Sequence, residues 1–370
     1  MAVLLDWIMS WSLRHRVVVI VAWLAIAMAG VLSFLRLPLD AFPDTTPVQV
    51  QVNTTASALG PLEIERQITA RIEQALGGLR GLVEVRSVSK PGFSQVTAIF
   101  SADAELYLSR QLILERVSTV ALPAGIERPS LGPVATGMGE VFQFLVRGKK
   151  NELPTAAPSR TLAELRTLQQ WTIAPQLRAV PGVAEVNTWG GDEREIQVAV
   201  DPTALLRHDI PLADLIEALQ HDNVNVGGGT IEENGEAAVV VGVGIVDNPQ
   251  QLEDIVIARR DGVPVCVRDV AQVVDGRSLR RGAVTADGTG EVVLGIGFLL
   301  MGENGQDVTH ALALRLASIE KSLPAGVTTE IVYARTTLID RVLHTVRTNL
   351  LEGALLVIAV LFVFLGNVRA

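Results

Sequence analysis

The sequence contains a single cysteine and little charge. Cys266 excludes a disulfide framework within one chain and any CxxC metal or redox motif. Charged residues make up 19% of the 370 residues, below the ~25% of an average globular domain, which indicates that part of the chain lies in lipid. The net charge of −9 argues against a general nucleic-acid binder. The apolar fraction of 49% excludes global disorder, and the length predicts two or three domains.

Motifs for enzymatic chemistry are also missing. The glycine run at 227–229 lacks the G-x-x-x-x-G-K spacing of a phosphate loop, and the five histidines lack the spacing of a zinc site. We therefore predict no catalytic residue, no cofactor and no enzymatic activity. Two adjacent pairs could each offer a cation two ligands, but we favour a surface position at a turn or helix end for both: His208 with Asp209, and His221 with Asp222.

Met138 and Cys266 are soft metal-ligand types that also serve as ordinary apolar side chains. Met138 lies in the run GMGE at 137–140, and a lone methionine usually fills a packing gap. Cys266 lies in an apolar, strand-like run, which predicts a small buried core residue. We therefore assign no metal ligand from these two residues, and whether the chain holds a metal stays open.

A first apolar run spans residues 17–35, 19 residues without a charge. At ~1.5 Å rise per residue this length just crosses a ~30 Å hydrocarbon core, and it exceeds the apolar part of a signal peptide. We predict an uncleaved transmembrane helix. The preceding Leu4, Trp7, Ile8 and Trp11 share one helical face, so this stretch either lies in the membrane interface or extends the spanning helix.

A second apolar run spans residues 350–366 and carries one charge, Glu352. Residues 338–349 are compatible with a helix and could continue the same helix out of the membrane. Glu352 is either a functional intramembrane carboxylate or, as we favour, an interfacial glutamate near the outer face. Basic residues precede the first run and follow the second, which places both termini in the cytoplasm and residues 36–349 outside.

The outer segment repeats one order of elements. Strand, helix, strand, strand and helix patterns are predicted at 48–52, 61–76, 82–88, 95–100 and 107–120, and again at 141–146, 162–180, 183–189, 195–200 and 211–220. This βαββα order is typical of ferredoxin-like units. In each set the two consecutive strands are predicted to be joined by a turn, at 90–92 and at 190–192. Further strands are predicted at 252–257, 264–267, 271–274, 291–300 and 327–333, with a helix at 308–323.

A long hairpin is predicted between the second set and these later strands. Asn234 and Gly235 lie between extended runs at 225–230 and 237–245, which is a strong hairpin signal. Because an isolated hairpin is marginally stable, this one packs either on a partner subunit or back on its own domain.

Two classes of function fit these patterns: the front part of a transporter, and a membrane-tethered sensor or scaffold. The short cytoplasmic ends leave no room for a signalling output domain, and two spans cannot enclose a transport pathway. We therefore expect the chain to be truncated or to be one segment of a larger assembly.

Several motifs resemble those of the resistance-nodulation-division (RND) efflux pumps, in particular their heavy-metal branch of cobalt–zinc–cadmium and copper–silver pumps. In chain order they are LPLDAFPD at 37–44, VQVQVNT at 48–54, PLEIE at 61–65, EVRSVS at 84–89, GFSQVT at 92–97, GP at 132–133, GMGE at 137–140, NVGGG at 225–229 and LFVFLGNVR at 361–369. The resemblance covers the whole chain in order.

The resemblance implies a specific architecture. We expect an α/β membrane protein in which two transmembrane helices flank a periplasmic region of repeated ferredoxin-like βαββα porter subdomains with an inserted docking subdomain. The expected ranges are 1–35 for the interfacial and first transmembrane helices, 36–133 for the first porter subdomain, 134–184 and 271–335 for the second, 185–270 for the docking subdomain with its protruding hairpin, and 336–370 for the second transmembrane helix.

The resemblance also implies function and partners. It predicts the N-terminal segment of a proton-driven, inner-membrane pump for heavy-metal cations that works as a homotrimer with a periplasmic adaptor and an outer-membrane channel. The proton-relay carboxylates and the metal ligands of such pumps lie in regions that correspond to no part of this chain, so we assign neither here and expect the chain alone to transport nothing. The alternatives are a multidrug-type RND component and a membrane-anchored periplasmic scaffold or sensor without transport activity.

Overall fold

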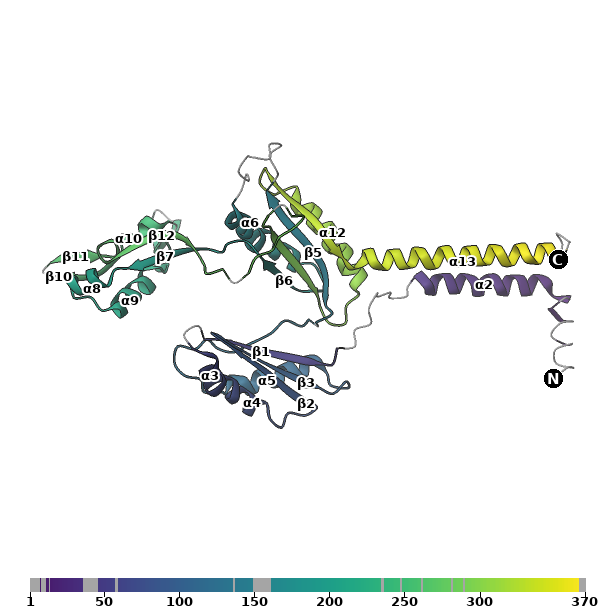
Figure 1. Ribbon diagram of the computed structural model, residues 1–370, viewed down its shortest axis with the longest axis horizontal. Helices are drawn as coiled ribbons and strands as arrows, with labels where there is room; N and C mark the ends of the chain where they lie inside the picture. Colours follow the sequence, from purple (N-terminus) through teal and green to yellow (C-terminus); the bar gives the residue numbers. More distant parts are fainter. Residues whose placement is uncertain are drawn as a thin grey trace.

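Two apolar helices lie at one end of the molecule, and three folded units extend away from them (Figure 1). The structure, a computed structural model, describes residues 7, 11–12, 14–35, 46–56, 59–135, 137–148, 161–233, 236–246, 248–260, 262–280, 282–288 and 290–365. We call the folded parts the first unit (residues 49–131), the second unit (140–189 and 293–334) and the inserted unit (194–277). The chain leaves the second unit to form the inserted unit and then returns to it.

The first unit is a four-stranded antiparallel sheet whose one face is covered by helices. Its elements are β1 (Gln49–Thr55), α3 (Pro61–Ile64), the π-helical turn η1 (Glu65–Thr69), α4 (Ala70–Leu76), β2 (Leu82–Lys90), β3 (Phe93–Phe100), α5 (Leu106–Ser118) and β4 (Ser130–Leu131). Alternate residues of β1 and β3 are buried, which follows from the period of two in a strand. Pro61 fits the first helical turn because that position needs no amide donor.

The second unit has the same arrangement, although its chain is interrupted. Its elements are β5 (Glu140–Gly148), α6 (Leu162–Leu168), the π-helical turn η2 (Gln169–Ile173), α7 (Ala174–Arg178), β6 (Val183–Trp189), β13 (Val293–Leu299), α12 (Gly305–Glu320) and β14 (Val327–Ala334). The sheet orders are β2-β3-β1-β4 and β14-β5-β13-β6, so in both units the first strand lies between the third and the fourth. Both units are therefore ferredoxin-like βαββαβ folds, each with its own core.

The hairpin predicted between residues 183–189 and 195–200 is wrong. β6 pairs with β13, about a hundred residues further along the chain, while β7 (Arg194–Val200) pairs with β12 (Ala271–Arg277) in the inserted unit. The glycine turn after β6 therefore marks a crossing between units rather than a hairpin. The expected boundary after 184 falls inside β6, and β12, expected in the second unit, pairs within the inserted unit.

The inserted unit contains the remaining elements. They are β7, α8 (Pro202–His208), α9 (Leu212–Asp222), β8 (Val226–Glu233), β9 (Glu236–Gly242), α10 (Pro249–Glu253), β10 (Val256–Arg260), β11 (Val263–Cys266), α11 (Val267–Val270) and β12. α8 was not predicted from the sequence. A strand was predicted at 252–257, but the chain completes α10 there before β10 begins. Leu205, Leu215 and Val267 lie in the small core of this unit.

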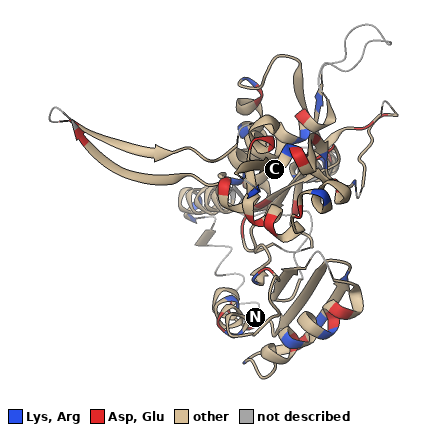
Figure 2. Cartoon of the chain, turned by 90° about the vertical axis from the view of Figure 1, so that its left-hand side faces the viewer, with Lys and Arg blue, Asp and Glu red and all other residues tan. Residues whose placement is uncertain are grey.

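β8 and β9 form the predicted antiparallel hairpin, which we call the arm. The arm extends away from the body of the molecule (Figure 2). All the side chains of β9 are exposed. The turn predicted at Asn234 and Gly235 lies outside the described residues, as do the predicted run at 37–44 and the last residues of the motif at 361–369.

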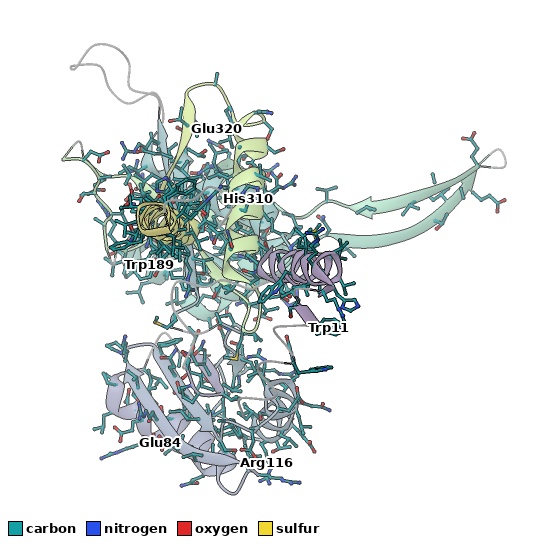
Figure 3. All side chains as sticks on the ribbon, turned by 90° about the vertical axis from the view of Figure 1, so that its right-hand side faces the viewer. Trp11, Glu84, Arg116, Trp189, His310 and Glu320 are labelled. Atoms are coloured by element: carbon teal, nitrogen blue, oxygen red, sulfur yellow. The ribbon has the colours of Figure 1, made fainter. Side chains whose placement is uncertain are left out.

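The two apolar helices are α2 (Arg16–Leu35) and α13 (Arg335–Leu365). Within the described residues, one helix is long and apolar enough to cross a membrane, the Arg335–Phe364 part of α13; the apolar part of α2, Arg16–Gly30, is shorter. α13 is continuous, which confirms that residues 338–349 extend the helix of the second apolar run. Seen along their axes, the helices lie apart from each other (Figure 3). Of the predicted interfacial face, only Trp7 and Trp11 are described, and both are exposed.

Candidate functional site

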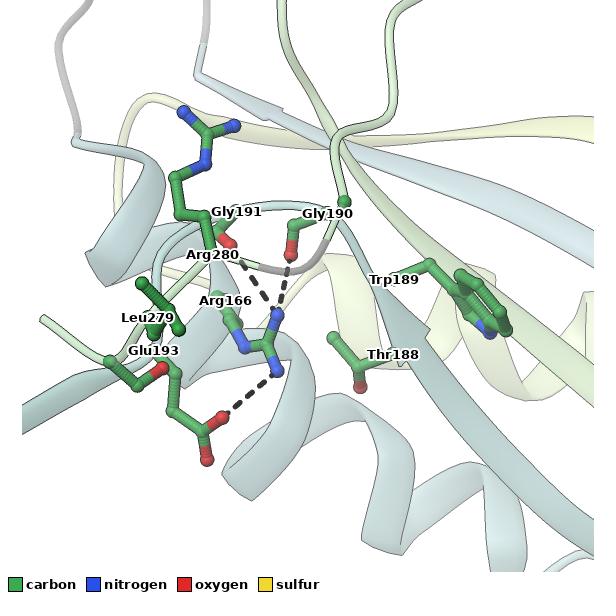
Figure 4. A pocket seen from close by; sticks show the side chains of 10 residues that line it. Arg166, Thr188, Trp189, Gly190, Gly191, Glu193, Leu279 and Arg280 are labelled. Carbon is green, nitrogen blue, oxygen red and sulfur yellow. Dashed lines mark hydrogen bonds and ion pairs between the residues drawn. The ribbon is translucent and has the colours of Figure 1, made fainter. Parts of the chain in front are cut away.

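A cavity of about 430 Å³ lies where the chain crosses between the second unit and the inserted unit. The end of β6, the glycine turn after it and the segment that follows β12 form the wall, and α6 contributes one side chain (Figure 4). The lining residues are Arg166, Thr188, Trp189, Gly190, Gly191, Glu193, Ser278, Leu279, Arg280 and Gly282.

Arg166 binds the chain where it leaves the second unit, at residues 190–193. Its Nη1 donates to the carbonyl oxygens of Gly190 and Gly191 at 3.0 and 3.4 Å, and its Nη2 lies 3.2 Å from Oε2 of Glu193 (Figure 4). The two glycines have φ values of 72° and 69°, in the left-handed region that favours glycine. A Cβ on Gly190 would lie 2.6 Å from the carbonyl oxygen of Val292, so the returning chain passes directly over this turn.

Ion pairs dominate the electrostatics around this cavity. A hydrogen bond to Glu291 raises the pKa of Arg280 above its ordinary value, with an additional Coulombic contribution from the same carboxylate. On the neighbouring ladder, the hydrogen bond from Arg194 lowers the pKa of Asp275, and both of these side chains are exposed. Arg280 is therefore charged at all physiological pH values, and Asp275 is ionised beside Arg194.

The two His–Asp pairs do not form a shared site. His208 is the last residue of α8, and Asp209 follows as its C-cap with φ 52°. Asp209 accepts from Arg260 through its carbonyl oxygen and lies 3.4 Å from the same guanidinium through its carboxylate. His221 and Asp222 end α9. Both pairs lie at helix ends, as predicted, and the described residues contain no group of three or more His, Cys, Asp or Glu side chains able to hold a metal ion.

The other singled-out residues lie apart from the cavity. Met138 is 45% exposed, and its carbonyl oxygen accepts from Nη1 of Arg335 at 3.0 Å. Cys266 is buried, as predicted for a core residue, and its backbone amide donates to Asp269. Glu352 lies on α13 with its side chain exposed. The run at 227–229 begins one strand of the arm.

The residues that line the cavity were not predicted from the sequence as a site. Gly190 and Gly191 were identified, but as a hairpin turn, and Arg166 was only one residue of a predicted helix. A second signal was available: residues 291–300 form a nearly continuous apolar run, which is typical of a strand buried between neighbours. That signal does not by itself state which strands pair.

The comparisons with known proteins place the whole chain in one family. The sequence profile of the AcrB/AcrD/AcrF family matches residues 8–370. The chain belongs to the AcrB/AcrD/AcrF family. This is the RND family that the motifs predicted, and the prediction is confirmed.

Several relatives of the chain are named for metal resistance or cation efflux. It is 49% identical over 369 residues to Protein HelA of Legionella pneumophila, 42% identical over 365 residues to the cobalt-zinc-cadmium resistance protein CzcA of Cupriavidus metallidurans, and 34% identical over 370 residues to the cation efflux system protein CusA of Escherichia coli. These alignments cover 98–99% of the chain and 34–35% of each relative. The chain thus spans about a third of the length of the relatives it matches.

A solved structure shows the same fold. The crystal structure of a heavy metal efflux pump matches 96% of this chain and 35% of its own chain, with a TM-score of 0.85 and 33% sequence identity. The three folded units and the helices of the AcrB/AcrD/AcrF chain therefore have the architecture of an RND transporter.

Proposed function

We propose that the chain is the N-terminal segment of a proton-driven RND efflux pump that exports heavy-metal cations from the periplasm or cytoplasm. The observation that carries this proposal is the alignment of 98% of the chain with a cobalt-zinc-cadmium resistance protein at 42% identity. The relatives named for cation efflux or metal resistance fall in the branch that the motifs at 37–54 and 137–140 resemble. The proton relay and the metal ligands belong, in this proposal, to the part of the pump beyond this chain.

In this proposal the first and second units are porter subdomains and the inserted unit is the docking subdomain. Ferredoxin-like units suit this role because each has a rigid core and few covalent connections to its neighbours, so the units can move as bodies. The range 36–133 is kept for the first porter subdomain. The pairing of β6 extends the first segment of the second porter subdomain, 134–184, to the end of that strand, and the pairing of β12 transfers this strand from the segment 271–335 to the docking subdomain, 185–270.

The proposed location is the bacterial inner membrane, with residues 36–349 in the periplasm. α2 and residues 350–364 of α13 support it because both are apolar and largely exposed, and the start of α2 and the end of α13 lie at the same end of the molecule (Figure 1). A helix with apolar residues on every side is stable only in lipid or among other apolar helices.

The proposed partners are two further copies of the pump in a homotrimer, a periplasmic adaptor and an outer-membrane channel. The arm supports a partner subunit because its apolar side chains are exposed, among them Ile231, Val239 and Val241. A two-stranded ribbon gains stability by packing on another surface, which a neighbouring subunit would supply.

A chimeric pump tests the proposed function. This chain replaces the matching third of the cobalt-zinc-cadmium resistance protein of Cupriavidus metallidurans, and the chimera is produced in a metal-sensitive bacterium that lacks its own metal pumps. We expect the chimera to restore growth in zinc, cobalt or cadmium, because the grafted segment supplies equivalent porter and docking units. The chain produced alone is expected to restore none.

Two outcomes would overturn the proposal. A chimera that is inserted and trimeric yet protects only against organic toxicants would favour the multidrug alternative. A chain that by itself moves metal out of vesicles would contradict the assignment of the transport machinery to the rest of the pump. A chimera whose arm residues 226–242 are replaced by a short loop is the matched variant for assembly, and it should fail to form trimers.

A further inference from the structure

The inserted unit is tied to the second unit by two chain crossings. The outgoing crossing follows β6 at residues 190–193, and the returning crossing follows β12 at residues 278–292. In Figure 1 the inserted unit lies apart from the sheet of the second unit. The orientation of the inserted unit therefore depends on the contacts made at these two crossings. The cavity described above lies between them.

Asp192 joins the two crossings. Its side chain is only 7% exposed, in contrast to the acidic residues of the other ion pairs. Oδ2 accepts from Nη1 of Arg277 at 2.6 Å, and Oδ1 lies 3.5 Å from Nε of Arg280. Arg277 ends β12 in the inserted unit, and Arg280 lies on the returning crossing. The buried carboxylate of Asp192, on the outgoing crossing, therefore binds two guanidinium groups, one at the end of β12 and one on the returning crossing.

Further contacts extend this connection at both ends. Arg280 also pairs with Glu291 at 2.5 Å, and Glu291 lies two residues before β13, the strand that returns to the second unit. At the other end Arg166 of α6 fixes the glycine turn that precedes Asp192. The backbone amide of Ser278 donates to the carbonyl oxygen of Glu193 at 2.9 Å, which ties the crossings directly. The contacts thus run from α6 through Asp192 to β13.

The charged side chains that line the cavity are paired within the protein. Arg166, Glu193 and Arg280 are its charged lining residues, and each is paired with a protein group. Among the buried side-chain polar atoms of the lining, Nε of Arg166 alone has no hydrogen-bond partner in the part of the chain that the structure describes. The same pairing is what a mechanical connection between two bodies requires.

We propose that Asp192 is an electrostatic clasp that fixes the angle between the inserted unit and the second unit. A buried carboxylate is costly without partners, so Asp192 keeps Arg277 and Arg280 close and the two crossings together. Gly190 and Gly191 adopt backbone angles open chiefly to glycine, and they are the points about which the inserted unit turns when the clasp is released. With the clasp closed, the inserted unit follows movements of the second unit.

Distances between spin labels test the clasp in the full chain reconstituted in lipid. Cys266 is replaced by Ala, and labels are placed on exposed positions of the two units, L206C on α8 and L314C on α12, with labelled chain diluted into unlabelled chain. The parent is expected to give one narrow distance distribution. Asp192→Asn, which keeps the shape but removes the charge, is expected to widen it at least about twofold.

Two further variants make the result specific. Arg277→Gln with Arg280→Gln breaks the same pairs from their exposed side, so it widens the distribution even if Asp192→Asn folds poorly. Asp275→Asn removes a carboxylate from the exposed pair with Arg194, which lies wholly inside the inserted unit, and leaves the distribution unchanged. A distribution as narrow as the parent's in folded Asp192→Asn and in the double variant would overturn the proposal. Equal widening by Asp275→Asn would also overturn it.

Discussion

Among single residues, Gly295 occupies a position where close packing leaves no room for any side chain larger than hydrogen. Gly295 on β13 lies beneath the fully buried ring of Phe144, and a Cβ there would come within 2.3 Å of Cζ of the ring and 2.7 Å of Nε2 of Gln169. Gln169 is itself fully buried, and neither amide atom has a hydrogen-bond partner among the described residues. In the core of the second unit, Gly295 thus leaves room for the Phe144 ring, and the Gln169 amide is buried beside them.

We expect Gly295→Ala to lower the free energy of unfolding by about 1–3 kcal/mol, because the added methyl group forces Phe144 out of its packing. Gly282→Ala is the matched control, since a Cβ at Gly282 meets nothing within 4 Å. Chemical denaturation of the chain in detergent, followed by far-ultraviolet circular dichroism, measures both. Equal stability of the two variants would show that the second-unit core can relax around the methyl group.

At the scale of elements, the helices of the two ferredoxin-like units share an unusual feature. In each unit the first helix contains a π-helical turn, η1 or η2, with α-helical residues on both sides. The polar residues Thr69 and Gln169 of these turns are buried against strands, and Thr69 forms a hydrogen bond to Ser94 at 2.8 Å. A π-helical turn contains an extra residue relative to an α-helix, which changes the face that the following turn presents.

The start of the second of these helices offers a test of local stabilisation. Thr161 caps α6: its Oγ1 accepts from the amide of Glu164 at 3.2 Å, and the Glu164 carboxylate accepts from the amide of Thr161 at 2.9 Å. We expect Thr161→Ala to cost about 1 kcal/mol because the amide of Glu164 loses its side-chain acceptor. Thr167→Ala, in the same helix, removes a hydroxyl that bonds only the preceding turn and is expected to have little effect. Thermal unfolding of the two variants compares them.

A smaller loss for Thr161→Ala than for Thr167→Ala would contradict the capping interpretation. The capped start also matters to the junction, because α6 carries Arg166 one turn later. A frayed α6 would loosen the contact between Arg166 and the glycine turn at 190–191.

At the scale of the whole molecule, the structure makes a prediction about sidedness. If α2 and α13 cross the same membrane, all three folded units lie on one side. In a chain with Cys266→Ala, we expect L314C on α12 to react with a membrane-impermeant maleimide in intact spheroplasts, while Arg14→Cys reacts only after permeabilisation, because Arg14 precedes the first apolar run. Labelling of L314C only after permeabilisation would reverse the topology.

Most elements and the family could be predicted from the sequence, but the partners of the strands could not. The alternation at 48–52 and 95–100, the helix starting at Pro61 and the arm were all predicted from local patterns, and the structure has them. The pairing of β6 was predicted incorrectly because the nearest following strand pattern, at 195–200, is also the most obvious hairpin partner. The contacts of Asp192 were missed for the same reason, since they join residues about 85 positions apart.

Local patterns were enough to predict the apolar helices, the alternating strands and the family, because each depends on residues close together in the chain or on the order of motifs along it. The folded chain was needed to show that β6 pairs with β13, that a complete unit is inserted between them, and that a buried carboxylate connects the two crossings. Strand pairing depends on which distant segments can reach the same sheet edge. Burial of a charge depends on which distant side chains pack around it and exclude water. Both are settled by the packing of the whole chain.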